Sequence, residues 1–256
     1  MVKLRALFWI LFVIVGASVM IGLGFWQLSR LNERRALNAE IKSRLNQPST
    51  TITGEALDTA TIEYRHAIVT GAFDFSQEIL LRNRSFSEIS GMHLLTPLRI
   101  EGSDVAVLVD RGWIAYTASD PQTRVAYASP AGLVTLTGII RLRQSRPSPL
   151  APLDPPLSPD LPRLDAWYWI DIPRIQQQVP YPLLPFFIEQ DAGPDPAALP
   201  AAGWEADFGD GPHLNYAIQW FSFAAILVVG SIALARKNMK RETTPAGGRA
   251  NDKLHV

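Results

Sequence analysis

Two long segments without any charged residue lie near the ends of the chain. Residues 6–26 read ALFWILFVIVGASVMIGLGFW, and residues 216–235 read YAIQWFSFAAILVVGSIALA. At about 1.5 Å per residue, a helix of either length spans the roughly 30 Å hydrocarbon core of a bilayer. We therefore predict two transmembrane helices, at residues 6–26 and 213–235.

The first apolar segment has two other interpretations. Lys3 and Arg5 precede it, as in the positive region of a cleaved signal peptide. However, the apolar run is longer than a usual signal sequence, no small-x-small cleavage site comes before Trp26, and a second span fits a retained hairpin. A buried core helix is the other alternative, and it does not explain two such segments on either side of a polar middle.

Basic residues indicate how the spans are oriented. Lys3 and Arg5 precede the first span, and four basic residues follow the second: Arg236, Lys237, Lys240 and Arg241. This predicts cytoplasmic tails at residues 1–5 and 236–256. Basic residues also follow the first span, but a long domain translocates largely regardless of charge. With no room for a transit peptide, we expect a multi-pass protein of a bacterial inner (plasma) membrane with a periplasmic domain.

The segment after the first span carries a helical pattern. Its apolar residues recur at helical spacing: Leu28, Leu31, Leu37, Ile41 and Leu45. We predict a juxtamembrane helix over residues 27–45. Its basic side chains, Arg30, Arg34, Arg35, Lys42 and Arg44, are most simply a solvated face that anchors the helix at the lipid headgroups.

The middle of the chain, residues 46–212, has the pattern of short β-strands. Segments rich in β-branched and aromatic residues lie at 62–75, 78–84, 92–100, 105–116, 133–143, 166–172 and 185–190. Their spacing predicts an antiparallel sheet curled toward a barrel or sandwich. Seven of the 16 residues at 147–162 are Pro, which predicts an extended surface loop there. The expected fold class is a membrane protein with two transmembrane α-helices, forming a hairpin, that flank a mainly β extramembrane domain.

Composition excludes several kinds of function. The 24 basic residues balance the 24 acidic ones, whereas a nucleic-acid binder usually has a basic surplus. The chain has no Cys, so it holds no disulfide, thiol nucleophile or Cys-ligated metal. No HExxH, GxSxG or phosphate-loop motif is present. We therefore expect a protein that does not bind nucleic acid and is not an enzyme.

The candidate site lies where the two predicted spans reach the same edge of the membrane. Of the four His, we interpret His66 and His93 as structural strand residues, whereas His213 stands directly before the second span. A hairpin places His213 at one depth with Trp26, Gln27, Arg30, Tyr216 and Trp220. These groups suit a planar, apolar, anionic ligand, with His213 as the axial ligand of an iron, Trp26 and Trp220 over a ring, and Arg30 on a propionate. An ordinary interfacial belt of aromatic residues is the alternative.

Six segments carry a resemblance to a known family. They read GLGFWQLSRL, GMHLLTPL, VLVDRGWIA, LTGIIR, PFFIEQ and HLNYAIQWFSFA, and they occur in this order along the chain. The chain resembles the surfeit locus family of cytochrome c oxidase assembly factors, of bacterial type. The combination of GxWQxxR with HxxYAxxWF is specific to that family. The family often has Asn before its RGW element, where this chain has Asp110.

The resemblance implies a function in the biogenesis of the respiratory chain. Bacterial members of the family are thought to bind haem a and to help deliver it to the haem-bearing subunit of a terminal oxidase. The family's histidine corresponds to His213, and its first-span element corresponds to Trp26, Gln27 and Arg30. The RGW element corresponds to Arg111, Gly112 and Trp113, to which we assign a structural role.

We therefore expect a membrane-anchored assembly factor, or chaperone, whose partners are haem a, the oxidase subunits and the lipid bilayer. Haem a would be held transiently at the outer leaflet, close to His213. The alternative is a cofactor-free membrane scaffold that binds oxidase subunits during assembly.

Overall fold

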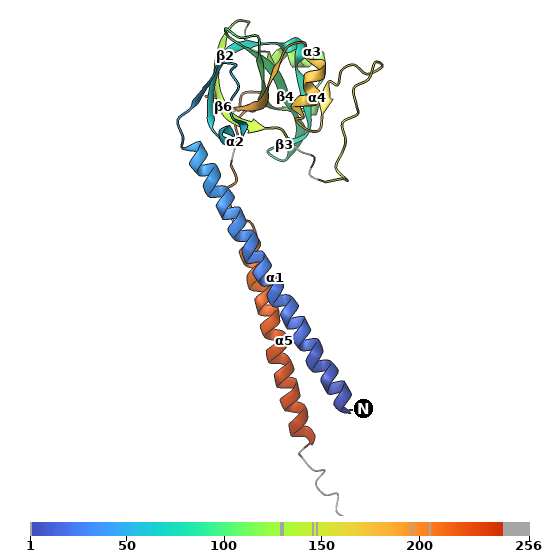
Figure 1. The fold of residues 1–256 in the computed structure, drawn as a ribbon. Coiled ribbons are helices and arrows are strands. Elements are labelled where there is room, and N and C mark those ends of the chain that lie inside the picture. Colours follow the sequence, from blue (N-terminus) through green and yellow to red (C-terminus); the bar gives the residue numbers. More distant parts are fainter. Residues whose placement is uncertain are drawn as a thin grey trace, which may run out of the picture. The chain divides into compact units, whose positions relative to one another are not determined.

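The structure is a computed structural model that describes residues 2–128, 131–144, 146, 148–195, 197–204 and 206–242. It divides into two compact units. One comprises Met1–Ala39 with Phe208–Val256, and the other is Glu40–Asp207. The first unit contains the two long helices, apart from residues 40–45 at the end of the first helix, and the second contains the β-strands (Figure 1).

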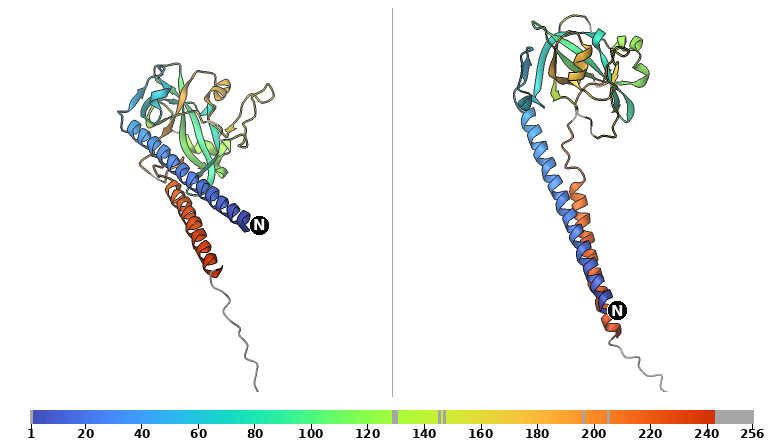
Figure 2. Two further views of the ribbon diagram at one scale, coloured as in Figure 1. Left: turned by 60° about the horizontal axis from the view of Figure 1, so that its bottom comes forward. Right: turned by 45° about the vertical axis from the view of Figure 1, so that its right-hand side comes forward.

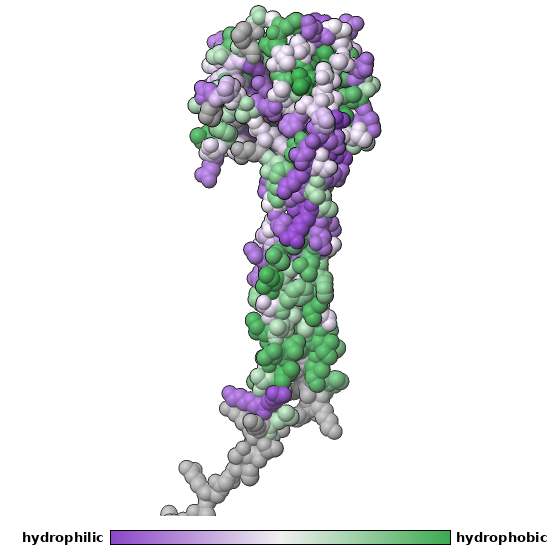
Figure 3. All heavy atoms as spheres, turned by 90° about the vertical axis from the view of Figure 1, so that its left-hand side faces the viewer, coloured by the Kyte–Doolittle hydropathy of each residue, from purple (hydrophilic) through white to green (hydrophobic). Residues whose placement is uncertain are grey.

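The long helices are α1, Val2–Leu45, and α5, His213–Glu242. They lie side by side and run antiparallel (Figures 1 and 2). Both are long and apolar enough to cross a membrane, at Leu7–Leu45 and His213–Met239. Only 11% of the most apolar window of each helix is buried, so most of its apolar side chains face outward, as in helices that contact lipid (Figure 3). The partition into membrane and aqueous segments stays a prediction.

The two helices meet along a seam of small residues. On α1, the buried positions Ala17, Gly24, Leu31 and Asn38 recur every seven residues. On α5, Ala217 and Ala224 are the buried positions, again seven residues apart. This heptad spacing is typical of helices packed as a coiled coil. A Cβ atom added at Gly24 would lie 2.6 Å from the Phe221 ring, so the absence of a side chain permits the close approach.

The second unit is built on one eight-stranded sheet, in the order β1-β2-β6-β8-β5-β4-β3-β7, with β2 also paired to β4. The β2–β4 pairing closes five of the strands into a small barrel. The strands are β1 Thr50–Ile52, β2 His66–Phe73, β3 Ile79–Phe86, β4 Ile89–Ile100, β5 Ala106–Ala115, β6 Val134–Leu142, β7 Ala166–Trp167 and β8 Leu183–Gln190. The short helices are α2 Thr59–Ile62, η1 Phe75–Gln77, η2 Tyr116–Ala118, α3 Pro121–Arg124, η3 Val125–Tyr127, α4 Ile172–Ile175 and η4 Gln176–Gln178.

The predicted fold class is confirmed: two candidate membrane helices flank a β-rich domain with a small barrel. The expectation of an antiparallel sheet is wrong for three strand pairs, because β1 pairs with β2, β3 with β7, and β5 with β8 in parallel. Hairpin connections make neighbouring strands antiparallel, whereas β8 enters the sheet after the long excursion of residues 143–182, which leaves its direction free.

Two of the predicted strands differ most in their limits from the observed ones. The first begins at His66 rather than residue 62, because the Asp58 carboxylate accepts a hydrogen bond from Ala60 N and starts helix α2. Of residues 166–172, only Ala166 and Trp167 form a strand. The described part of the Pro-rich segment, residues 148–162, contains no helix or named strand.

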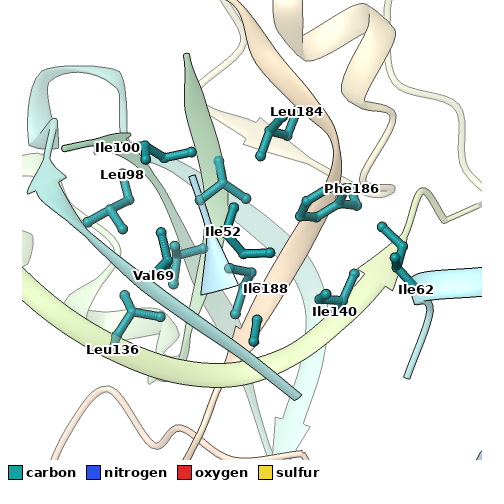
Figure 4. Close-up of a cluster of buried hydrophobic side chains, with 13 residues drawn as sticks. Ile52, Ile62, Val69, Leu98, Ile100, Leu136, Ile140, Leu184, Phe186 and Ile188 are labelled. Atoms are coloured by element: carbon teal, nitrogen blue, oxygen red, sulfur yellow. The ribbon is translucent and has the colours of Figure 1, made fainter. Parts of the chain in front are cut away.

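Apolar side chains fill both sides of the central strands. One cluster fills the barrel, with Leu98, Phe186 and Ile188 among its members (Figure 4). A second cluster, which includes Leu108, Trp167 and Phe187, covers the other face. Because β5 is buried on both faces from Ala106 to Ile114, its sequence shows a nearly continuous apolar run instead of an alternation.

One buried ion pair interrupts this apolar interior. Arg111 donates to Glu78 at 3.1 Å, and the Thr96 hydroxyl donates to the same carboxylate oxygen at 2.6 Å. Arg111 and Glu78 side chains are only 5% and 8% exposed. Burial lowers the pKa of Arg111, and the negative charge of Glu78 opposes that shift. The arginine also donates to the Tyr127 carbonyl.

The rest of the RGW element is equally confined. Gly112 has φ +113°, and a Cβ atom there would lie 2.3 Å from the Ala201 carbonyl oxygen. Trp113 is buried and forms a two-way backbone bridge with Ala201. These contacts give the element a structural role in the described domain.

We expect Arg111→Met to destabilise the domain by about 3–5 kcal/mol, because it leaves the Glu78 carboxylate buried without a partner. Urea unfolding of the full chain in detergent, followed by tryptophan fluorescence, measures this. The double variant Arg111→Met/Glu78→Met should recover much of the loss. Glu40→Gln breaks the more exposed pair with Arg44 and should cost under about 0.5 kcal/mol. A loss for Arg111→Met no larger than that of the control contradicts the assignment.

We expect Gly24→Val to separate the two helices, since its side chain would overlap the Phe221 ring. The chain has no Cys, so single labels at Val19→Cys and Ile226→Cys report the separation by pulsed electron paramagnetic resonance. The measured distance should lengthen or broaden in the variant. Gly22→Val is the matched control, because nothing lies within 4 Å of a Cβ atom at Gly22. Equal distances in both variants would contradict the close packing at Gly24.

Candidate functional site at the ends of the two long helices

His213 is the first residue of α5, where a turn sets its position. Gly211 has φ +66°, which L side chains rarely adopt, and Pro212 follows it. The Pro212 carbonyl then accepts from Tyr216 N at 3.1 Å and opens the helix. The turn formed by the sequence GDGP therefore places His213 at the start of α5.

Gln27 of α1 contacts this histidine across the seam. The Gln27 Oε1 atom lies 2.9 Å from His213 Nδ1, and both side chains are half-buried. An amide oxygen only accepts hydrogen bonds, so the imidazole donates from Nδ1–H. The hydrogen on Nδ1 leaves Nε2 of the neutral ring with a lone pair, which is the form that binds metals.

Trp220 shares the face of α5 that carries His213. The two are seven residues apart, and together with Ala217 and Ala224 they follow the heptad pattern of the seam. The Trp220 ring is half-buried and meets Phe223 edge to face, with ring centroids 6.2 Å apart. His213, Gln27 and Trp220 are therefore the predicted site residues that lie on the seam.

The other predicted site residues lie away from the seam. Trp26 is 53% exposed and Tyr216 is 46% exposed. The Arg30 guanidinium lies 6.0 Å from the centre of the Trp26 ring and also pairs with Glu33 at 2.7 Å. Among the described residues, no ring contact joins Trp26 to Trp220. The site roles of these three residues stay predictions.

The side chains available as metal ligands determine which kind of metal cofactor this site could hold. Among the described residues, no group of three or more His, Asp or Glu side chains is placed to hold a metal ion. A haem needs fewer protein ligands, because its ring supplies four nitrogens and one imidazole can provide an axial bond. A single half-buried histidine with Nε2 left unprotonated fits that requirement.

A second polar cluster, which we call the Asp110 cluster, lies in the β-domain and comprises His93, Asp110, Arg141 and Glu189. His93 Nδ1 lies 3.0 and 2.9 Å from the two Asp110 carboxylate oxygens, and Gly112 N donates to Asp110 at 3.0 Å. Arg141 donates to Glu189 at 3.1 Å. A small cavity of about 110 Å³ is lined by His93, Asp110 and Glu189.

Sequence reasoning treated His93 as structural and did not identify this cluster. The residues come from four different strands, and the parallel register of β5 with β8 places Asp110 opposite Glu189. No local motif encodes that pairing. Burial raises the pKa of Glu189; the charges of Arg141 and His93 favour its ionised form, and the charge of Asp110 opposes it.

Comparison with known proteins relates the whole arrangement to one family. A family model described as the SURF1 family matches residues 14–225, a range that includes Gln27 and His213. A SURF1-like protein from Monosiga brevicollis is 29% identical over 235 residues, which cover 87% of this chain and 86% of that protein. Surfeit locus protein 1 from Mus musculus is 28% identical over 228 residues, covering 84% of this chain and 71% of that protein. The human protein of the same name is 26% identical over 219 residues, covering 80% and 70%.

We expect Glu189→Gln to change how stability depends on pH. A carboxyl group whose pKa is raised by folding stabilises the folded state below its unfolded pKa, and that contribution is lost as the pH rises through the folded value. Stability of the variant relative to the wild type should therefore increase between about pH 4 and pH 7. Thermal unfolding at several pH values measures this, with the exposed Glu101→Gln as control. A relative stability that falls over the same range would contradict the expectation.

Proposed function

The chain belongs to the SURF1 family, the surfeit locus family of cytochrome c oxidase assembly factors, and from this premise we propose that it binds haem a transiently and aids its insertion into the haem-bearing subunit of the oxidase. The family is one of assembly factors and not of catalysts. An assembly factor acts by binding and releasing a component, and the candidate binding site for that component is at His213.

The observation that carries the proposal is the hydrogen bond between His213 and Gln27. It leaves Nε2 of a half-buried imidazole available as an axial ligand at the start of α5. Trp220, on the same face of the helix, supplies a flat apolar surface. The bound group would contribute its iron and its porphyrin ring, while the protein contributes the imidazole and the apolar surroundings.

The two apolar helices indicate a membrane protein, and we propose that the membrane is the bacterial inner membrane. Basic residues flank the two helices on the side of the chain termini, with Lys3 and Arg5 before the first helix and Arg236 and Lys237 at the end of the second apolar run. This distribution supports cytoplasmic tails. In this orientation the β-domain faces the periplasm. It would present its surface to oxidase subunits while the helical unit holds the haem at the outer leaflet.

We expect His213→Ala to lose or shift the absorption band of haem a. The measurement is a spectrum of the detergent-purified full chain, produced together with a haem a biosynthesis pathway. The matched control is His66→Ala, which removes a half-buried histidine from β2 in the other unit. It should keep the band of the wild type.

Two results would overturn the proposal. A His213→Ala spectrum identical to that of the wild type would exclude this histidine as the ligand. A folded wild type that carries no haem, with haem a available, would leave a cofactor-free scaffold for oxidase subunits as the function.

A further inference from the structure

We propose that Gln27 is a positioning residue that fixes the tautomer of His213 and limits its strength as a ligand. The tautomer follows from the geometry of the chain, whereas the effect on an iron ligand rests on the proposed function. Gln27 thus acts through the histidine, by way of Nδ1, rather than on the cargo.

The contact between Gln27 and His213 determines which ring nitrogen is free. Gln27 Oε1 lies 2.9 Å from His213 Nδ1 and offers only lone pairs. The hydrogen bond holds the proton on Nδ1 and orients the ring, while Nε2 remains a base. Without this partner the neutral imidazole would exchange its proton between both nitrogens, and part of the population would have Nε2 blocked by hydrogen.

The helix seam keeps Gln27 within reach of the ring. Gln27 stands one turn after Gly24, on the same face of α1. The bare Gly24 lets the Phe221 ring of α5 lie close to the α1 backbone, and the rings of Phe25 and Phe221 meet edge to face at 5.4 Å. An amide side chain of fixed length can therefore bridge the helices at the start of α5.

The chemical type of the partner sets the strength of the ligand. A carboxylate at this position would form a charge-assisted hydrogen bond and draw the Nδ1 proton away, which makes the imidazole a stronger donor to iron. The neutral amide orients the ring without that increase. His213 backed by Gln27 is thus suited to a cargo that must be released.

The tautomer can be tested without any cargo. ¹⁵N-histidine NMR of the full chain in detergent, at a pH where the ring is neutral, distinguishes Nδ1–H from Nε2–H, and comparison with His213→Ala identifies the signal. The wild type should show Nδ1–H. Gln27→Leu should shift the signal toward Nε2–H, and Gln27→Glu should retain Nδ1–H. A wild type with Nε2–H, or a Gln27→Leu variant with the wild-type tautomer, would overturn the proposal.

The strength of the ligand is tested with haem a bound. Gln27→Glu should lower the reduction potential and slow the transfer of haem a to apomyoglobin by about tenfold. Gln219→Glu is the matched control, since it makes the same chemical change at an exposed position of α5. Equal effects of both variants would overturn the claim about ligand strength. If no variant binds haem while the tautomers are as expected, the proposed function fails and the positioning by Gln27 stands.

Discussion

Close packing of α1 against α5 is the constraint on which the helical unit depends. Lipid tails are as apolar as the side chains they surround, so helices in a bilayer gain little from apolar burial alone and associate through close contact and interhelical hydrogen bonds. Ala17, Gly24, Ala217 and Ala224 provide that contact. The Gln27–His213 hydrogen bond adds the polar link, and it forms only because the small residues bring the two backbones together.

The β-domain has to accommodate charged groups that are withdrawn from solvent. Arg111 pairs with Glu78 in the interior, and the half-buried Arg141 pairs with Glu189. The Arg141 guanidinium also lies beside two aromatic rings that contact each other, 4.8 Å from the centre of Tyr64 and 5.5 Å from that of Trp204. Such pairs cost desolvation and add little net stability, but each is costly to break by removing one partner.

What the sequence predicted well depends on local pattern. The two apolar runs and the segments rich in β-branched and aromatic residues reflect the conformational preferences of neighbouring residues, and the structure has helices and strands there. The described part of the Pro-rich loop has no helix or named strand. For His213 and Gln27, the sequence predicted only that both residues lie at the same depth in the membrane, and not that they form a hydrogen bond. The Asp110 cluster was not anticipated, because its four side chains meet through the register of strands far apart in sequence.

The role of Gln27 shows the same limit on a smaller scale. Its position beside Trp26 in the GxWQxxR signature gave it a place in the site, but not a direction for its side chain. Direction depends on the heptad phase of α1 against α5, which turns Gln27 into the seam and leaves Trp26 53% exposed.

The order of the strands has a consequence for synthesis of the chain. β8 fills the place between β5 and β6, yet it is the last strand to leave the ribosome. Until residue 190 has emerged, β5 and β6 each present an unpaired edge, and the apolar faces beside them lack a cover. Barrel closure therefore waits for nearly the whole domain, and only 22 residues, 191–212, separate it from the start of α5. The nascent chain is exposed to misassociation for most of its translation, and it completes its core just as its second apolar helix is made.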